Sequence, residues 1–216
     1  MTNITGFSYA MSFIKEAEGE YVNHPNDKGG ETWGGIARNM HPKWKGWEAV
    51  DLAKEKNKTK SSLNKSLRSN KMLKVMKLEF YEKEFWDEID ALPFNYKIKV
   101  FLFDYAINSG HENAYKALQR ALGVKADGII GSRTIGAYKD QYKPSLLYSL
   151  KQKRDQFYND IVKSNPSQGV FLDGWLNRSD SALCFGMDCG IEIAKKDTIL
   201  KKALELAVLI INKFKS

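Results

Sequence analysis

The sequence has 216 residues, of which 43% are hydrophobic and 28% are charged, and its formal net charge is +8. This composition is that of a globular protein with a substantial core, in one domain or two small ones. It contains no apolar stretch of the roughly 18 residues that a membrane span needs, and its basic charge predicts an acidic partner: nucleic acid, an anionic membrane or an anionic cell-wall polymer.

The N-terminal segment MTNITGFSYAMSFIKEAEG has no basic region and no long apolar run, so it lacks the pattern of a standard signal peptide. We therefore expect the protein to be made and kept in the cytoplasm until another route releases it. The same segment predicts an amphipathic helix, because apolar residues recur at helical spacing at Phe7, Ala10, Phe13, Ile14 and Ala17.

A stretch rich in acids and glycine follows this helix: AEGEYVNHPNDKGGETWGG, residues 17–35. Its glycine pairs predict turns and a small β-hairpin within residues 23–36. Glu18 follows the helix directly, where the negative end of the helix dipole and apolar neighbours both raise the pKa of a carboxyl group. We expect Asp27 to stay ionised in a polar turn and Thr32 to be able to orient a water molecule. An acid and a base in contrasting environments suit a glycosidase, but spacing alone leaves an ordinary surface turn open.

Residues 54–71, KEKNKTKSSLNKSLRSNK, hold seven Lys or Arg against one Glu. We predict a solvated helix and loop anchored by Leu63 and Leu67, with a contact surface for an anionic polymer as the alternative. Residues 72–87 predict another helix, with four apolar residues on one face: Met72, Val75, Met76 and Phe80.

The second half is also helical. Residues 97–110, KIKVFLFDYAINSG, form the most apolar helix of the chain so far, so we expect it to be central. A helix over 112–122, a compact turn at Asp127 and Gly128, and a helix beginning near Ser132 follow. Leu147 to Ile161 carry a further helix, and the last helix spans about 191–214.

Two features near the C-terminus leave alternatives open. The last helix has an apolar stripe with lysines at both ends, so it either packs on the second domain or makes weak contact with an anionic membrane. Cys184 and Cys189 are either reduced thiols or a disulfide formed after release. They cannot form a zinc site alone, and the three His (24, 41 and 111) are scattered, so we predict no metal or other cofactor.

The N-terminal motif resembles the signature of glycoside hydrolase family 108, the N-acetylmuramidase family. That signature is Glu-Gly-Gly-Tyr, then Asp-x-Gly-Gly-x-Thr and a Gly-Ile pair, which appear here as residues 18–21, 27–32 and 35–36. The resemblance implies that Glu18 is the general acid and that Asp27 and Thr32 are its partners, in the order found in phage-type lysozymes. One position departs from the signature, since Glu20 replaces its second glycine; Glu20 either points into solvent or takes part in substrate binding.

The likeness continues into the second half. Residues 85–137 resemble the helical peptidoglycan-binding domain that follows the catalytic part in this family, and residues 171–178, FLDGWLNR, resemble its terminal segment. The resemblance implies a mainly α fold, with a lysozyme-like catalytic part and a small β-hairpin near the active site, packed on a helical second domain. We assign residues 1–92 to a catalytic muramidase domain and residues 93–216 to a peptidoglycan-binding-like domain that includes the C-terminal helix.

The implied substrate is peptidoglycan, cut at the β-1,4 bond between N-acetylmuramic acid and N-acetylglucosamine, and its carboxylates suit the basic charge. Aromatic rings often bind sugars, and polar side chains can form hydrogen bonds to them. The candidates for substrate binding are therefore Tyr21, Glu20, Trp33, Asn108 and Tyr105, with Trp86 as a further aromatic candidate. We expect a monomeric endolysin of a phage or prophage that binds no nucleic acid, because no nucleic-acid-binding motif occurs. A lytic transglycosylase and a non-catalytic peptidoglycan-binding protein are the alternatives, and the sequence leaves open whether hydrolysis inverts or retains the anomer.

Overall fold

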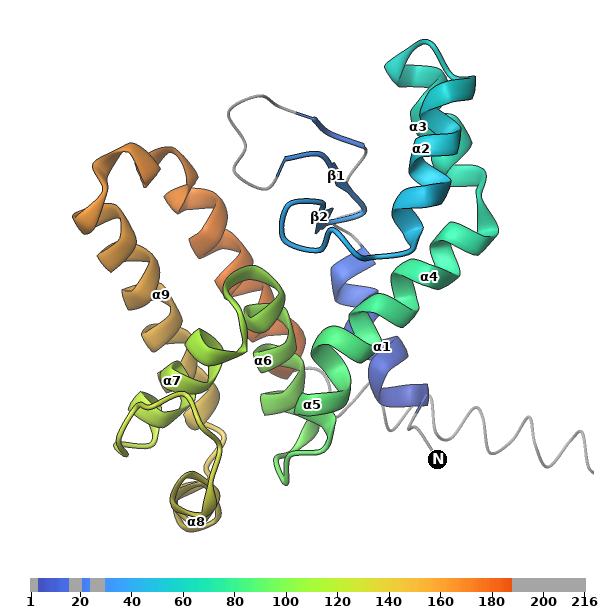
Figure 1. Cartoon of the computed structure of the whole chain (residues 1–216). Coiled ribbons are helices and arrows are strands. Elements are labelled where there is room, and N and C mark those ends of the chain that lie inside the picture. Colours follow the sequence, from blue (N-terminus) through green and yellow to red (C-terminus); the bar gives the residue numbers. More distant parts are fainter. Residues whose placement is uncertain (1–3, 16–20, 24–29, 188–216) are drawn as a thin grey trace, which may run out of the picture. The chain divides into compact units, whose positions relative to one another are not determined.

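The computed structural model describes residues 4–15, 21–23 and 30–187 (Figure 1). The chain divides into two compact units. One is formed by Ile14–Glu88 and is called the hairpin unit below; the other, called the helical unit, combines Met1–Phe13 with Ile89–Ser216. The described residues are mainly helical and include a small antiparallel hairpin, which confirms the mainly α fold class.

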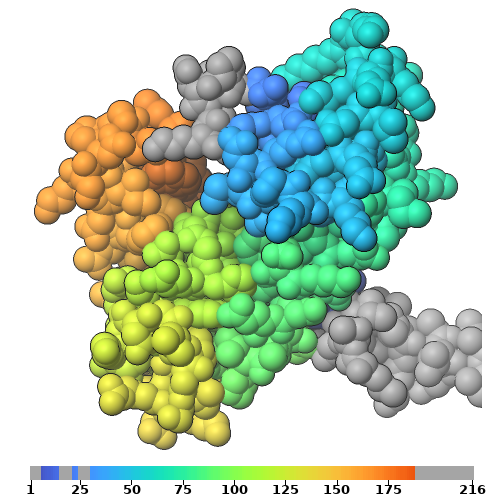
Figure 2. All heavy atoms as spheres, in the orientation of Figure 1, coloured from blue at the N-terminus to red at the C-terminus, as the bar shows by residue number. Residues whose placement is uncertain are grey.

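The hairpin unit contains two short strands. In it, β1 (Thr32–Trp33) pairs antiparallel with β2 (Ile36–Ala37), with Thr32 opposite Ala37 and Trp33 opposite Ile36. Three mutually packed helices follow: α2 (Gly46–Lys56), α3 (Lys60–Ser69) and α4 (Lys71–Tyr81). The last of these continues through a π-helical turn, η1 (Glu82–Trp86), into α5 (Asp87–Asp90). On the surface, the blue residues of the hairpin adjoin the cyan residues of α2 and α3 (Figure 2).

The predicted hairpin is made possible by two consecutive glycines. Gly34 and Gly35 form the two-residue turn between the strands and have φ angles of 58° and 84°. Positive φ at both central positions is the requirement of the type I′ turn, whose twist matches that of the strands. The hydroxyl of Tyr81 on α4 donates to the carbonyl of Gly34 over 3.0 Å, which fastens the turn to the helix.

The core of the hairpin unit confirms one sequence prediction and corrects another. Leu63 and Leu67 are buried, as predicted for the basic segment that becomes α3. The predicted apolar face of α4 was wrong in part, because Met72 and Val75 are 67% and 48% exposed, whereas Phe80 is buried as expected. The buried residues of this helix are Leu73, Lys77, Phe80 and Tyr81. A lysine can occupy such a face because its long apolar stem is buried while its ammonium group stays polar.

The helical unit is built around α6 (Tyr96–Ser109), in which every residue from Ile98 to Ala106 is buried. Two helices pack against it, α7 (His111–Ala121) and α9 (Leu146–Ser164), while α8 (Ser132–Gln141) lies between them in the sequence. After α9 come η2 (Pro166–Phe171) and helical residues 172–187. Residues 4–13 of α1 (Ile4–Lys15) complete the unit, with the ring of Phe7 edge-on to that of Phe103. The prediction that residues 97–110 form a central helix is confirmed.

A buried ion cluster holds α6, α9 and the following helix together. Asp104 is 1% exposed and accepts from Nη1 of Arg154 over 2.7 Å and from Nη2 of Arg178 over 2.7 Å. Arg154 is fully buried, and its guanidinium lies 4.9 Å from the ring centre of Tyr105. A buried charge is stable only when paired and hydrogen-bonded, so these three side chains fix the packing of three helices.

The turn predicted at Asp127 and Gly128 is held by one buried side chain. Nε2 of Gln119 donates to Oδ1 of Asp127 over 2.8 Å and to the carbonyl of Ile129 over 2.9 Å, while its Oε1 accepts from the N–H of Gly128 over 2.8 Å. The next helix begins at Ser132, as predicted.

Several predictions concern residues outside those described. The C-terminal helix expected over 191–214 and Cys189 are among them; Cys184 is an exposed free thiol. Within residues 4–15, 21–23 and 30–187, no helix is long and apolar enough to span a bilayer. The predicted domain boundary between residues 92 and 93 stays a prediction.

Candidate active site

The chain on either side of the predicted catalytic loop is joined by backbone pairing. The N–H of Val22 donates to the carbonyl of Thr32 over 2.9 Å, and the N–H of Thr32 donates to the carbonyl of Val22 over 2.7 Å. Residues 22 and 32 are therefore neighbours in space, although they are ten positions apart in the sequence. Thr32 itself is half-buried at the start of β1.

Glu18, Glu20 and Asp27 lie outside the described residues. Their predicted roles, and that of Thr32, stay predictions. The described residues next to them show what holds this part of the chain in place.

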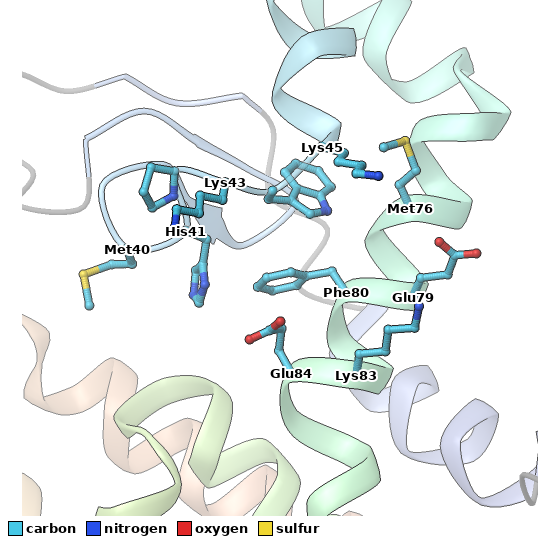
Figure 3. Close-up of a pocket in the computed structure, with 11 residues that line it drawn as sticks. Met40, His41, Lys43, Lys45, Met76, Glu79, Phe80, Lys83 and Glu84 are labelled. Atoms are coloured by element: carbon cyan, nitrogen blue, oxygen red, sulfur yellow. The ribbon is translucent and has the colours of Figure 1, made fainter.

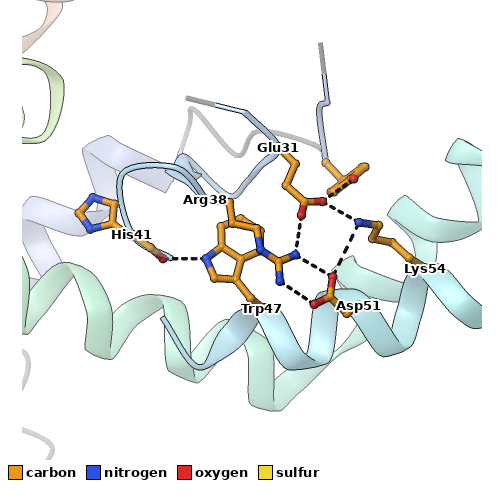
Figure 4. Close-up of polar contacts among 7 residues, drawn as sticks. Glu31, Arg38, His41, Trp47, Asp51 and Lys54 are labelled. Carbon is orange, nitrogen blue, oxygen red and sulfur yellow. Dashed lines mark hydrogen bonds and ion pairs between the residues drawn. The ribbon is translucent and has the colours of Figure 1, made fainter. Parts of the chain in front are cut away.

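A network of charged side chains connects the base of the loop to α2 (Figure 4). Glu31 sits at its centre, with Oε1 2.5 Å from Nη1 of Arg38 and Oε2 2.8 Å from Nζ of Lys54. Arg38 also donates from Nη1 and Nη2 to the two carboxylate oxygens of Asp51, each over 2.7 Å. Tyr21 completes the network, because its hydroxyl donates to Oε2 of Glu31 over 2.6 Å. The bidentate pairing of Arg38 with Asp51 fixes the orientation of the two side chains as well as their distance.

The network changes the acidity of its members. Burial alone would raise the pKa of Glu31, but hydrogen bonds from Lys54, Tyr21 and Arg38 outweigh it and hold that pKa below its ordinary value of 4.5. The hydrogen bonds from Arg38 lower the pKa of Asp51. The hydrogen bond to Glu31 raises the pKa of Lys54. All three groups are therefore charged at neutral pH, and the network is a set of full ion pairs.

Tyr21 is anchored twice. Besides its hydroxyl contact, its backbone N–H donates to Oδ1 of the buried Asn64 on α3 over 2.9 Å. The ammonium group of Lys54 lies 5.7 Å from the centre of its ring, within the range of a cation–π contact. The residue that follows the predicted acid by three positions is thus fixed to both α2 and α3.

An aromatic cluster supports the other side of the hairpin. The ring of Trp33 stacks on that of Trp44 with centroids 6.0 Å apart, and the ammonium of Lys77 lies 5.7 Å from the Trp33 ring centre. Trp44 in turn meets Trp47 edge-on at 5.3 Å, and Nε1 of Trp47 donates to the carbonyl of His41 over 2.9 Å. These contacts fix residues 41–47 against β1.

The predicted substrate-binding residues differ in exposure. Tyr21 and Trp33 are 8% and 5% exposed, so little of either residue is open to solvent. In the helical unit, Asn108 is exposed near the end of α6, where its Nδ2 donates to the carbonyl of Asp104 over 2.7 Å. Tyr105 has no exposed surface and lies in the core beside Arg154. A ring with no exposed surface cannot stack on a sugar in this arrangement. Trp86 is likewise buried.

Sequence reasoning missed the charged network. Asp51 and Lys54 are spaced i, i+3 on α2, which signals a pair on one helix face. No local pattern connects them to Glu31 or Arg38, because those pairings depend on how the hairpin meets α2. In the described part of the chain, no group of His, Cys, Asp and Glu is arranged to hold a metal ion.

Comparison with known families assigns this region. Residues 11–110 match the model of the glycosyl hydrolase 108 family, and this span contains the motif from Glu18 to Ile36. Residues 11–110 belong to glycoside hydrolase family 108. Residues 113–180 match the model of a predicted peptidoglycan domain. The family 108 region therefore extends through α6, beyond the limit of the hairpin unit at Glu88.

One solved structure is similar to this chain over most of its length. The structure of SagA from Brucella abortus is similar to this chain over 84% of its length and 93% of the length of SagA, with 27% sequence identity and a TM-score of 0.58. No match was found among curated proteins. The two family matches together indicate a glycosidase that acts on peptidoglycan.

Proposed function

We propose that this family 108 protein is an N-acetylmuramidase, which hydrolyses the β-1,4 bond between N-acetylmuramic acid and N-acetylglucosamine. The observation that carries the proposal is the family match over residues 11–110, which contains Glu18, Asp27 and Thr32 at the positions of the family motif. The charged network supports it, because Tyr21 and Glu31 are held on either side of the segment that contains Asp27.

In the proposed reaction, Glu18 is the general acid that protonates the glycosidic oxygen as the bond to the anomeric carbon breaks. Asp27 accepts a proton from the attacking water, and the hydroxyl of Thr32 orients that water. Hydrolysis of this kind needs one carboxylic acid that is still protonated and one that is ionised. The strand pairing of Thr32 with Val22 gives its hydroxyl a fixed support.

The second region supplies attachment to the wall in this proposal. The match of residues 113–180 to a predicted peptidoglycan domain supports this role, as does the net charge of +8, since peptidoglycan carries carboxylates. Exposed Asn108 is a candidate donor to an acetamido group of the substrate. The biological role that we propose is that of a phage or prophage endolysin, made in the bacterial cytoplasm and active on the wall after release.

Loss of turbidity of a peptidoglycan suspension tests the proposal. We expect Glu18→Gln to abolish the turbidity loss while the circular dichroism spectrum stays that of the wild type. Glu16→Gln is the matched control, since it makes the same change two residues earlier and outside the motif, and it should keep full activity. A fully active Glu18→Gln variant would contradict the role of Glu18. Full activity of Asp27→Asn would instead favour a lytic transglycosylase, which needs no base to activate water.

A further inference from the structure

The hairpin unit has an open groove that the proposed chemistry does not use. It has a volume of about 640 Å³ and lies between residues 40–45, which follow the hairpin, and the part of α4 and η1 that contains Met76, Phe80 and Lys83 (Figure 3). This volume is within the range of about 300–1,000 Å³ that is usual for small-molecule sites. All its lining residues belong to the hairpin unit.

The floor of the groove is aromatic. Half-buried Trp44 and His41 both meet the ring of Phe80, with centroids 6.0 Å and 4.7 Å away. The Trp44 ring lies directly against Gly46, where a Cβ would be 2.2 Å from it. Trp33 stacks on the same ring, at an interplanar angle of 13°. The Trp44 ring is therefore held rigidly, so the protein loses little side-chain entropy when a ligand stacks on this ring.

The rim of the groove is charged. Lys43, Lys45 and Lys83 are exposed, and in the described part of the chain none of their ammonium groups has an ion-pair partner. Glu79 and Glu84 lie on the same rim and leave it with a net positive charge. Met40 is 70% exposed at one end. A groove for an apolar helix would show a larger continuous apolar surface, whereas an aromatic floor with polar groups above it suits a sugar, which has a C–H face and hydrogen-bonding edges.

We propose that this groove is a subsite for the glycan strand of peptidoglycan, in which an N-acetylhexosamine stacks on Trp44 and separate carboxylates of the muramic acid and its stem peptide pair with Lys43 and Lys83. This inference rests on the proposed function for its choice of polymer. The stacking of Trp33 on Trp44 connects the groove directly to β1, which carries Thr32. A glycan bound in the groove would therefore contact the same aromatic cluster that supports the proposed catalytic segment.

A subsite of this kind contributes the same binding free energy to the ground state and to the transition state. Its loss should therefore raise KM and leave kcat nearly unchanged. This separates the inference from the proposed function, because loss of Glu18 should abolish kcat.

The test measures affinity with the full-length Glu18→Gln protein, by calorimetric titration with two probes. One probe is a soluble glycan of alternating N-acetylglucosamine and N-acetylmuramic acid with its stem peptides; the other is an uncharged oligomer of N-acetylglucosamine. The combined variant Lys43→Ala and Lys83→Ala removes only exposed side chains, so its fold should persist. Lys74→Ala is the control, since Lys74 is exposed on α4 but does not line the groove.

We expect the double variant to bind the anionic glycan about three- to tenfold more weakly, as for two partly exposed ion pairs, and to bind the uncharged oligomer as before. Trp44→Leu should weaken binding of both probes. Unchanged affinity of the double variant for the anionic glycan, or an equal loss with the uncharged oligomer, would overturn the inference. Turnover is measured in parallel with the active enzyme, in which Glu18 is intact, with and without the two lysine substitutions. An unchanged KM in the active double variant would refute the subsite but would not contradict the muramidase proposal.

Discussion

The hydroxyl of Tyr21 donates a hydrogen bond to Oε2 of Glu31 over 2.6 Å. This contact joins two parts of the chain on either side of the segment that contains Asp27, beside the backbone pairing of Val22 with Thr32. Lys54 of α2 binds the same carboxylate, and so does Arg38, which also pairs with Asp51 of α2, so ion pairs fix Glu31 to α2.

Removal of the phenolic hydroxyl by Tyr21→Phe should weaken this junction. We expect the free energy of unfolding to fall by about 1 kcal/mol, the usual net worth of one such hydrogen bond, and turnover to fall because the catalytic segment is held less firmly. Urea denaturation and turbidity assays measure the two effects. Tyr148→Phe, at a side chain that is 51% exposed, is the control and should change neither.

The contribution of Glu31 to stability should depend on pH. Its pKa in the folded protein lies below the ordinary value of 4.5, so the stabilisation is fully present above that value and is lost as pH falls through the lower, folded pKa. The difference in unfolding free energy between wild type and Glu31→Gln should therefore be largest near neutral pH and shrink below pH 4.5. Denaturation curves over a pH series check this, and a difference that grew on acidification would contradict the ion-pair account.

The hairpin turn should not tolerate a side chain at Gly35. Its φ of 84° is unfavourable for other residues, and a Cβ there would lie 2.5 Å from the hydroxyl oxygen of Tyr81. We expect Gly35→Ala to lower the free energy of unfolding by about 1–2 kcal/mol. Gly136→Ala is the counterpart inside α8, where no atom lies within 4 Å of the added Cβ, and it should be neutral or stabilising. Thermal melts of both variants separate the effect of the positive φ and the close contact at Gly35 from the general effect of replacing a glycine with alanine.

Breaking the buried ion cluster of the helical unit should be costly. Asp104→Ala would leave fully buried Arg154 without its carboxylate partner, and we expect a loss of about 3–5 kcal/mol in the free energy of unfolding. Arg178→Met should cost less, because the side chain of Arg178 is 27% exposed and water can replace part of its interaction. Equal losses from the two variants, measured by chemical denaturation, would refute this ranking.

Sequence patterns predicted the features that depend on local chemistry. The Gly34-Gly35 turn, the central helix of residues 97–110 and the turn at Gly128 each have a local signal, and the structure has all three. The match of the N-terminal motif to family 108 was likewise predicted from residues close together in the sequence and is confirmed by the family model.

Features that depend on long-range packing were missed or mistaken. The pattern of Met72 and Val75 did not predict the buried face of α4, because that face includes Lys77, whose ammonium group lies 5.7 Å from the ring centre of Trp33. Tyr105 was a candidate for substrate binding by residue type, and its burial beside Arg154 depends on the packing of α9 against α6. The pairing of Arg38 with Asp51 joins a hairpin to a helix and has no signal in the local sequence.

The most direct test of the muramidase proposal is the mass of the products released from purified peptidoglycan in water enriched in a heavy isotope of oxygen. Hydrolysis predicts new N-acetylmuramic acid reducing ends that carry one heavy oxygen, formed by the wild type and absent with Glu18→Gln. Products with 1,6-anhydro ends, each lighter by one water and free of the heavy isotope, would contradict hydrolysis and identify a lytic transglycosylase. New reducing ends on N-acetylglucosamine would contradict the proposed bond.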